Sequence, residues 1–179
     1  MSKSNLGKIL VIAVLVVGAI LVALRQRQPR PVVIGEAAPG FRLPGLNSGS
    51  ISLKTYHRQV VVLNFWATWC PPCVEETPSL VKFAEEMRGQ HVEVIGVSVD
   101  QDRSAVESFA RRFHIPYPVA LDPDQAVSSL YGTFKFPETY ILDRNGKVAE
   151  KVIGATNWDD PRMRSFVQQL AQDSRGPGE

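Results

Sequence analysis

Two cysteines, Cys70 and Cys73, follow directly on a stretch of apolar sequence. Val60 to Trp66 reads Val-Val-Val-Leu-Asn-Phe-Trp, which is typical of a strand buried on both faces. The two prolines between the cysteines cannot lie within such a strand. Beyond them, Val74 to Met87 repeats apolar residues at spacings of three and four, which predicts a helix. The sequence thus predicts a strand, a turn, Cys-Pro-Pro-Cys and a helix in that order. This order limits the possible folds more than any other stretch of the chain.

A cysteine at the start of a helix has a specific chemistry. Unpaired N–H groups and the helix dipole stabilise negative charge there, so they favour the thiolate, which is the nucleophile. The spacing allows one helical turn to bring both sulfurs within bonding distance. We therefore expect Cys70 to attack a substrate disulfide and Cys73 to resolve the mixed disulfide that forms.

The competing interpretation of a Cys-x-x-Cys pair is half of a zinc site. A second pair of ligands would be needed, but His57, His91 and His114 are scattered singly and the chain has no further cysteine. The sequence therefore favours a redox pair over a metal site, and we expect no metal.

Composition limits the size and the partners of the protein. With 179 residues, of which 44% are hydrophobic, the chain can form one ordinary domain and an appendage. The net charge is only +2 and the basic residues form no stripe, which argues against a nucleic-acid partner. Two cysteines do not make a disulfide scaffold.

The appendage is an apolar run near the amino terminus. Ile9 to Leu24 is uninterrupted, and with the three residues before it, residues 6–24 reach the roughly 18 residues of a membrane-spanning helix. A cleaved signal peptide is the alternative, but no clear Ala-x-Ala site follows, so we predict an uncleaved anchor. Basic residues flank both sides and leave the orientation open. We place the domain outside because a single N-terminal anchor usually exports the domain that follows it.

These features divide the chain into four parts. We predict a cytoplasmic stub and transmembrane anchor over residues 1–25, a linker over 26–34, a globular domain over 35–172 and a flexible tail over 173–179.

Within the domain, apolar patterns and turn residues predict a mixed sheet with helices on both faces. A capping-box pattern at Ser104 to Glu107 marks the expected start of its second helix, and Asp160 with Pro161 that of the last. The other expected elements are strands over 41–43, 51–53, 92–99, 119–121, 139–142 and 148–153 and a short helix over 126–131.

The segment Asn64 to Cys73 resembles the active-site sequence of the thioredoxin superfamily. Phe136-Pro137-Glu138 is similar to the cis-proline segment that precedes the hairpin of that family. The additional strand and helix between Val92 and Leu130 resemble the insertion of the TlpA/ResA/CcmG (DsbE) branch. The resemblance implies a thioredoxin-like three-layer α/β sandwich with an N-terminal hairpin and this central insertion, preceded by one transmembrane helix.

That branch consists of exported, membrane-anchored thiol–disulfide oxidoreductases, which commonly reduce apocytochrome c before haem attachment, or other exported proteins. The resemblance therefore implies disulfide-containing exported substrates, a membrane thiol protein as electron donor and contact with the bilayer through residues 6–24. It places the protein in the bacterial cytoplasmic membrane as a single-pass protein, with its domain on the periplasmic or extracytoplasmic side. No cofactor is expected beyond the Cys70–Cys73 redox pair.

The family pattern also assigns roles to single residues. Pro137 would be the cis-proline that offers backbone groups to a bound peptide, with Phe136 before it. Trp69, directly before the first cysteine, is expected to shield the site and pack beside the substrate, as are Pro71 and Pro72. Glu76, three residues after Cys73, matches an acidic residue of this branch and could accept or relay a proton; the alternative is a solvated helix residue.

Two departures from thioredoxin itself bear on the chemistry. Asn64 occupies the position of its buried aspartate and cannot ionise, which gives Glu76 greater weight. Oxidants of the superfamily often carry histidine between the cysteines, and two prolines stand there instead, which favours a reductant.

Two alternatives remain. A peroxidase of the peroxiredoxin kind would carry Pro-x-x-x-Thr-x-x-Cys, whereas Leu63 and Ala67 occupy the matching positions. A copper-delivery protein of this fold would carry Cys-x-x-x-Cys and a distant histidine, although soft thiolates do select Cu(I).

Overall fold

The strand that precedes the cysteines is the central strand of a five-stranded sheet of order β5-β4-β3-β6-β7. The structure is a computed structural model that describes residues 8, 12–21, 31–47 and 49–173. β3, β4 and β5 are parallel neighbours, whereas β6 and β7 are antiparallel. The strands are β3 (Val60–Trp66), β4 (Val92–Ser98), β5 (Val119–Leu121), β6 (Glu138–Leu142) and β7 (Val148–Ile153). The predicted mixed sheet is confirmed.

Every residue of β3 is buried, as its apolar sequence predicts. Successive side chains of a strand point to opposite faces of the sheet. Val60, Val62 and Trp66 accordingly belong to one hydrophobic cluster and Val61, Leu63 and Phe65 to another. A strand with two buried faces needs cover on both sides.

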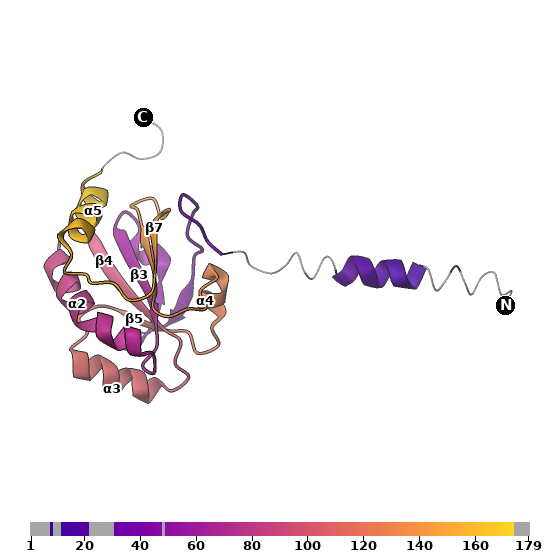
Figure 1. The fold of residues 1–179 in the computed structure, drawn as a ribbon, viewed down its shortest axis with the longest axis horizontal. Helices are drawn as coiled ribbons and strands as arrows, with labels where there is room; N and C mark the ends of the chain where they lie inside the picture. Colours follow the sequence, from indigo (N-terminus) through magenta and orange to yellow (C-terminus); the bar gives the residue numbers. More distant parts are fainter. Residues whose placement is uncertain (1–7, 9–11, 22–30, 48, 174–179) are drawn as a thin grey trace. The chain divides into compact units, whose positions relative to one another are not determined.

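Helices supply that cover on both faces of the sheet (Figure 1). α2 (Pro71–Met87), α3 (Arg103–Phe113) and α5 (Pro161–Gln172) pack on one face through Phe83, Phe109, Val167 and their neighbours. α4 (Ala126–Tyr131) packs on the other face, where Tyr131 lies against Phe65. This arrangement is the thioredoxin-like α/β sandwich that the family resemblance implies.

The expected opening hairpin is present and shifted by about one residue. β1 (Arg42–Pro44) pairs antiparallel with β2 (Ser50–Ser52), and a short 3-10 helix, η1 (Leu53–Tyr56), leads into β3. Leu46 donates its backbone N–H to the carbonyl of Val119, 2.8 Å away. The hairpin thus covers the edge of the main sheet beside β5.

The predicted cap of α3 is wrong. The helix begins at Arg103, and the carboxylate of Asp102 accepts the backbone N–H of Ser104 at 2.8 Å. An aspartate before the helix satisfies a free N–H of the first turn, so the helix starts before the Ser-x-x-Glu pattern. At α5, the predicted Asp160 cap with Pro161 at the first helical position is confirmed.

Residues 31–179 form one compact unit and residues 1–30 another. Within the unit of residues 1–30, residues 12–21 are helical. Among the described residues, no helix has the length and apolar character needed to cross a membrane. The predicted anchor over 6–24 lies partly outside the described residues, as does nearly all of the predicted tail.

Candidate active site

The two cysteines lie where the central strand passes into the first helix of the domain. Cys70 is the N-cap of α2, and Pro71 and Pro72 occupy the first helical positions, where a backbone N–H would have no partner within the helix. Cys70 and Cys73 form a disulfide. The Cys73 N–H points at the Cys70 sulfur, 3.3 Å away. The predicted Cys-Pro-Pro-Cys at a helix start is confirmed.

The disulfide is shielded from solvent by its surroundings. Cys70 is 4% exposed and Cys73 is 2% exposed, whereas both intervening prolines are exposed. Trp69 is 64% exposed, which is unusual for so large an apolar group. An exposed indole directly before Cys70 leaves apolar surface open to solvent beside the disulfide.

The segment before β6 lies next to the disulfide. Glu138 is paired with Phe65 of β3, so Pro137 follows in register toward the strand end that leads to Cys70. The Phe136–Pro137 peptide bond is cis, as predicted. The Phe136 ring stands edge-on to that of Trp69, with centroids 6.2 Å apart. Trp69, Phe136 and Pro137, predicted to contact substrate, therefore come together beside Cys70.

Glu76 lies within the protein, one helical turn after Cys73. It is only 4% exposed, so the solvated-residue alternative is wrong. Burial raises the pKa of its carboxyl group to about 7, and the hydrogen bond from Trp158 acts in the opposite sense. Oε1 accepts that bond, while Oε2 has no partner among the described residues. Glu76 can thus exchange a proton near neutral pH.

Tyr117 and Asn64 are two further polar side chains in the interior of the domain. Burial raises the pKa of the Tyr117 hydroxyl, and the charge of Glu76 raises it further, so Tyr117 stays neutral. Asn64 donates its side-chain N–H to the Thr139 hydroxyl at 2.9 Å and ties β3 to β6. Asn64 therefore has a structural contact at its position, and Glu76 is the buried carboxyl group on the helix that carries the cysteines.

Asp100 is a residue that the sequence analysis missed. Its buried carboxylate accepts the backbone N–H and the hydroxyl of Thr68, at 2.9 and 2.5 Å, and the hydroxyl of Ser98 at 2.8 Å. Asp100 thereby fixes the loop that carries Trp69 into Cys70. Its position just after a parallel strand could have indicated it, because sites gather at the carboxyl ends of such strands.

Glu138, directly after the cis-proline, is a second such residue. It is 3% exposed, and its Oε1 contacts Nζ of Lys151 and the hydroxyl of Tyr140, both at 2.7 Å. The partners come from β6 and β7, which the sequence places in a hairpin without specifying which side chains pair. These contacts fix the start of β6, which directly follows Pro137.

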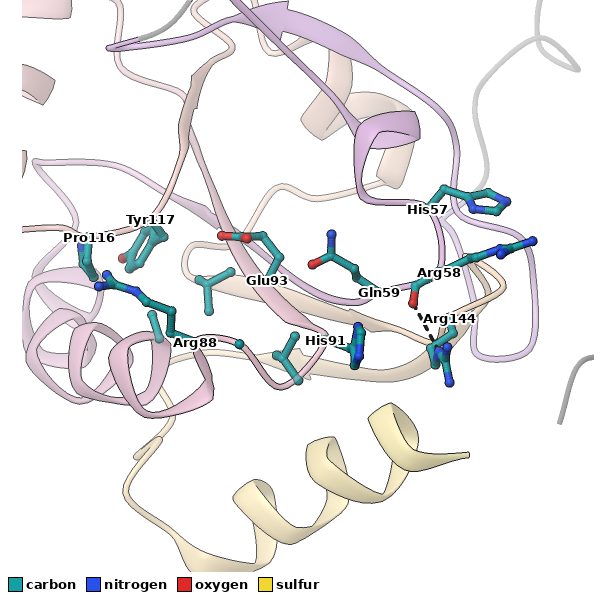
Figure 2. A pocket seen from close by; sticks show the side chains of 13 residues that line it. His57, Arg58, Gln59, Arg88, His91, Glu93, Pro116, Tyr117 and Arg144 are labelled. Atoms are coloured by element: carbon teal, nitrogen blue, oxygen red, sulfur yellow. Dashed lines mark hydrogen bonds between the residues drawn. The ribbon is translucent and has the colours of Figure 1, made fainter. Parts of the chain in front are cut away.

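A separate hollow of about 850 Å³ lies at the opposite end of the sheet, where β3 and β4 begin (Figure 2). Basic side chains line much of it, and Arg144 donates Nε to the backbone carbonyl of Arg58 at 3.1 Å. It contains none of the predicted site residues. The chemistry therefore belongs to the end of the sheet where β3 finishes.

A thioredoxin-like sandwich with a shielded Cys-x-x-Cys disulfide at a helix start, beside a cis-proline, defines a thiol–disulfide oxidoreductase. Comparison with known proteins agrees. The model of the AhpC/TSA family matches residues 34–151, and the chain belongs to this family.

Named relatives give the same class. The chain is 32% identical over 173 residues to the thiol-disulfide oxidoreductase ResA of a Bacillus cereus strain, covering 95% of this chain and 99% of that protein. It is 36% identical over 129 residues to ResA of Geobacillus thermodenitrificans, covering 72% and 74% of the two chains. A Chlorobium tepidum structure described as a thiol:disulfide interchange protein DsbE superposes with a TM-score of 0.73 at 28% identity, covering 78% and 99%.

Proposed function

We propose that this oxidoreductase works as a reductant, transferring electrons from its two cysteines to disulfides in exported proteins. Apocytochrome c is the substrate we favour. The observation that carries the proposal is the placement of Cys70 at the start of α2, directly after the exposed Trp69, with the buried Glu76 one turn beyond Cys73. Two prolines between the cysteines leave no imidazole to favour an oxidant.

The reaction balances as two thiol–disulfide exchanges. The Cys70 thiolate attacks one sulfur of the substrate disulfide, so a Cys70–substrate bond forms and the other substrate sulfur leaves as a thiolate that takes up a proton. Cys73 then gives up its proton, and its sulfur attacks Cys70. The Cys70–Cys73 disulfide forms, and the second substrate sulfur leaves and is protonated. Two electrons have passed to the substrate.

Glu76 is the group that we assign to the proton of Cys73. A residue three positions along a helix lies on the same face, one turn away. With a pKa of about 7, its carboxyl group is near half-ionised at neutral pH and so can both accept and return a proton. Trp69, Phe136 and Pro137, with Pro71 and Pro72, would contact the substrate chain.

The proposal also includes the cellular setting. An anchor over residues 6–24 would hold the domain on the outer side of the bacterial cytoplasmic membrane, within reach of exported substrates and of a membrane thiol protein that reduces Cys70–Cys73 again. The apolar run from Ile9 to Leu24 supports it. Labelling of an introduced surface cysteine in whole cells, with a reagent that does not cross the membrane, tests the location.

A trapping experiment tests the activity. Cys73→Ser removes the resolving thiol, so reaction with an oxidised apocytochrome c peptide should accumulate a mixed disulfide at Cys70. Cys70→Ser is the matched control and should form none. If Cys73→Ser yields no adduct while the protein is folded, the proposal fails. Rapid consumption of hydrogen peroxide by the wild-type protein would instead favour a peroxidase.

A further inference from the structure

A buried carboxyl group depends on the few donors that reach it. Glu76 accepts a hydrogen bond from the indole of Trp158, whose Nε1 lies 2.5 Å from Oε1. Trp158 is itself completely buried, and its ring packs on that of Phe83 with centroids 5.1 Å apart. The indole ring therefore has little freedom to turn away, and its N–H is directed at one oxygen of Glu76.

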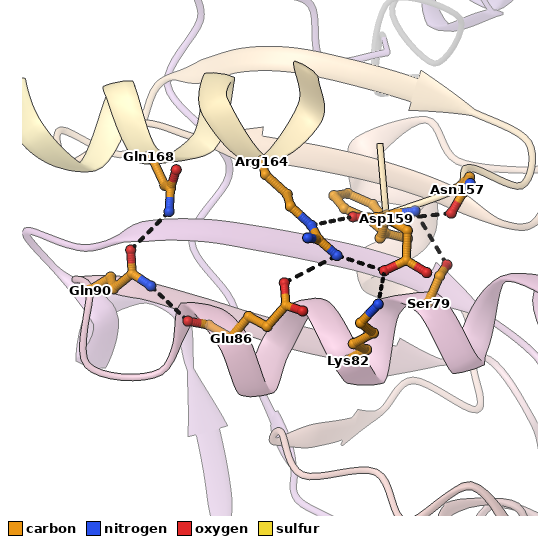
Figure 3. A network of polar contacts seen from close by, with 9 residues as sticks. Ser79, Lys82, Glu86, Gln90, Asn157, Asp159, Arg164 and Gln168 are labelled. Carbon is orange, nitrogen blue, oxygen red and sulfur yellow. Dashed lines mark hydrogen bonds and ion pairs between the residues drawn. The ribbon is translucent and has the colours of Figure 1, made fainter. Parts of the chain in front are cut away.

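The backbone around Trp158 is held from two helices. Its N–H donates to the hydroxyl of Ser79 on α2 at 3.3 Å, and its carbonyl accepts Nε of Arg164 on α5 at 3.4 Å (Figure 3). Residues 154–160 belong to no helix or strand that would fix this position. Contacts from α2 and α5 accordingly set where the indole lies.

Arg164 is the centre of these contacts. Its Nη2 lies 2.6 Å from Asp159 and 3.1 Å from Glu86, and Lys82 contacts Asp159 from α2 at 2.9 Å (Figure 3). Arg164 is only 26% exposed, so a guanidinium fork holds three groups at once in a partly shielded place. The ion pairs join both helices to the residue next to Trp158.

We propose that Trp158 is a positioning residue that fixes the orientation of the Glu76 carboxyl group, and that Arg164 in turn fixes Trp158. The inference rests on the proposed function, in which Glu76 exchanges a proton with Cys73. Trp158 does not touch the sulfurs in this scheme and acts only through Glu76.

The chemical consequence is a distinction between the two oxygens of Glu76. An indole N–H can only donate a hydrogen bond, and the Glu76 oxygen that accepts it is Oε1. When Glu76 is protonated, its proton therefore resides on Oε2, the oxygen without a partner among the described residues. Trp158 thereby determines which oxygen gives and takes the proton.

Other charged or titratable groups near Glu76 must be considered in any pH experiment. The Tyr117 hydroxyl interacts with it electrostatically from the segment before β5. A surface hollow reaches Glu76 and is also lined by Glu75 and Lys82 of α2 and by Asp159. None of these side chains is altered in the variant that tests Trp158.

The test follows the titration of Glu76 by NMR of isotope-labelled carboxyl carbons in the oxidised protein, with the resonance assigned by Glu76→Gln. Trp158→Phe keeps a ring against Phe83 but removes the N–H that stabilises the carboxylate. The Glu76 midpoint should therefore move upward, by about one pH unit. The peptide-reduction rate should shift its pH profile in the same direction.

Trp66→Phe is the matched control, because the Trp66 indole N–H is also buried but has no partner among the described residues. It should leave the Glu76 midpoint unchanged. An unchanged midpoint in folded Trp158→Phe would overturn the inference, as would an equal shift in Trp66→Phe.

Arg164→Gln is the second variant and tests the same point if Trp158→Phe does not fold. Loosening the Trp158 backbone should move the Glu76 midpoint upward by less than the Trp158 change. Arg162→Gln is its control, because among the described residues Arg162 pairs with Asp160, the cap of α5, whereas Arg164 contacts Asp159, Glu86 and the Trp158 carbonyl. Equal midpoints in folded Arg164→Gln and Arg162→Gln would show that Arg164 does not fix Trp158.

The titration also separates this inference from the proposed function. If the midpoint shifts but no peptide disulfide is reduced, Trp158 positions Glu76 and the proposed reaction is wrong. If peptide is reduced but the Glu76 midpoint and the pH profile are unchanged in Trp158→Phe, the proposed reaction is supported and Trp158 does not position Glu76.

Discussion

Glu76 is a carboxylic acid in a place that water hardly reaches, and its pKa makes a prediction for stability. The folded-state pKa of about 7 lies above the ordinary value of 4.5, so the folded state binds the proton more tightly than the unfolded state. The stability of the oxidised domain should therefore fall as pH rises from 4.5 through 7, by about 3 kcal/mol.

Urea unfolding at about pH 5 and about pH 8 measures this difference. Glu76→Gln cannot ionise and should lose that part of the pH dependence. Glu75→Gln, altered at the neighbouring and less buried position, should retain it. Equal pH dependence in wild type and Glu76→Gln would contradict the assigned pKa.

Asp100 makes a prediction for the loop before the cysteines. Asp100→Ala leaves the N–H and hydroxyl of Thr68 and the hydroxyl of Ser98 without their acceptor, and should lower the free energy of unfolding by about 2–3 kcal/mol. Asp124→Ala removes an exposed carboxylate from a turn and should change little. Chemical denaturation compares the two, and equal effects would show that the loop does not depend on Asp100.

At the scale of single residues, the sequence predicts the redox cysteines and their motifs better than it predicts the residues that surround them. The cysteines, Trp69, Phe136 and Pro137 belong to short contiguous motifs, so their positions could be predicted. Trp158 lies 82 positions beyond Glu76 in the chain, and contacts with α2 and α5 in the assembled fold bring the two side chains together. No local pattern could have indicated that hydrogen bond.

At the scale of elements, the β6–β7 hairpin carries the buried pair of Glu138 and Lys151. Lys151→Met leaves the Glu138 carboxylate buried without its cation and should destabilise the domain by about 3 kcal/mol. Lys147→Met, an exposed position in the same hairpin, should be close to neutral.

The double variant Glu138→Gln with Lys151→Met distinguishes a lost charge pair from lost packing. Removing both charges should restore part of the stability lost in Lys151→Met, because no unpaired charge is then buried. Denaturation curves of the single and double variants give the coupling energy. A double variant less stable than Lys151→Met would contradict this explanation.

The elements themselves follow the sequence closely, and the differences lie at their ends. β3 and β4 are identified by continuous apolar runs, and α5 by Asp160 with Pro161. The start of α3 was misassigned because two capping residues, Asp102 and Ser104, stand two positions apart, and backbone geometry selects between them. The pattern around Ser104 alone does not contain that information.

At the scale of the whole molecule, the sheet order brings the separate motifs to one place. β3 lies between β4 and β6, so the residues that follow β3 meet Asp100 beyond β4 and Pro137 before β6. The apolar runs predict that β3 and β4 are central, and the resemblance predicts the insertion. The pairings between distant side chains required the assembled fold.

The central claim is that the Cys70–Cys73 pair donates electrons. Its equilibrium reduction potential in defined thiol buffers, followed by tryptophan fluorescence on the protein without residues 1–30, tests that claim most directly, because those residues form a separate unit. The proposed function predicts a value below about −220 mV, in the range of thioredoxin-like and glutaredoxin-like donors. A value near or above about −180 mV would contradict it, and the protein would then form or rearrange disulfides.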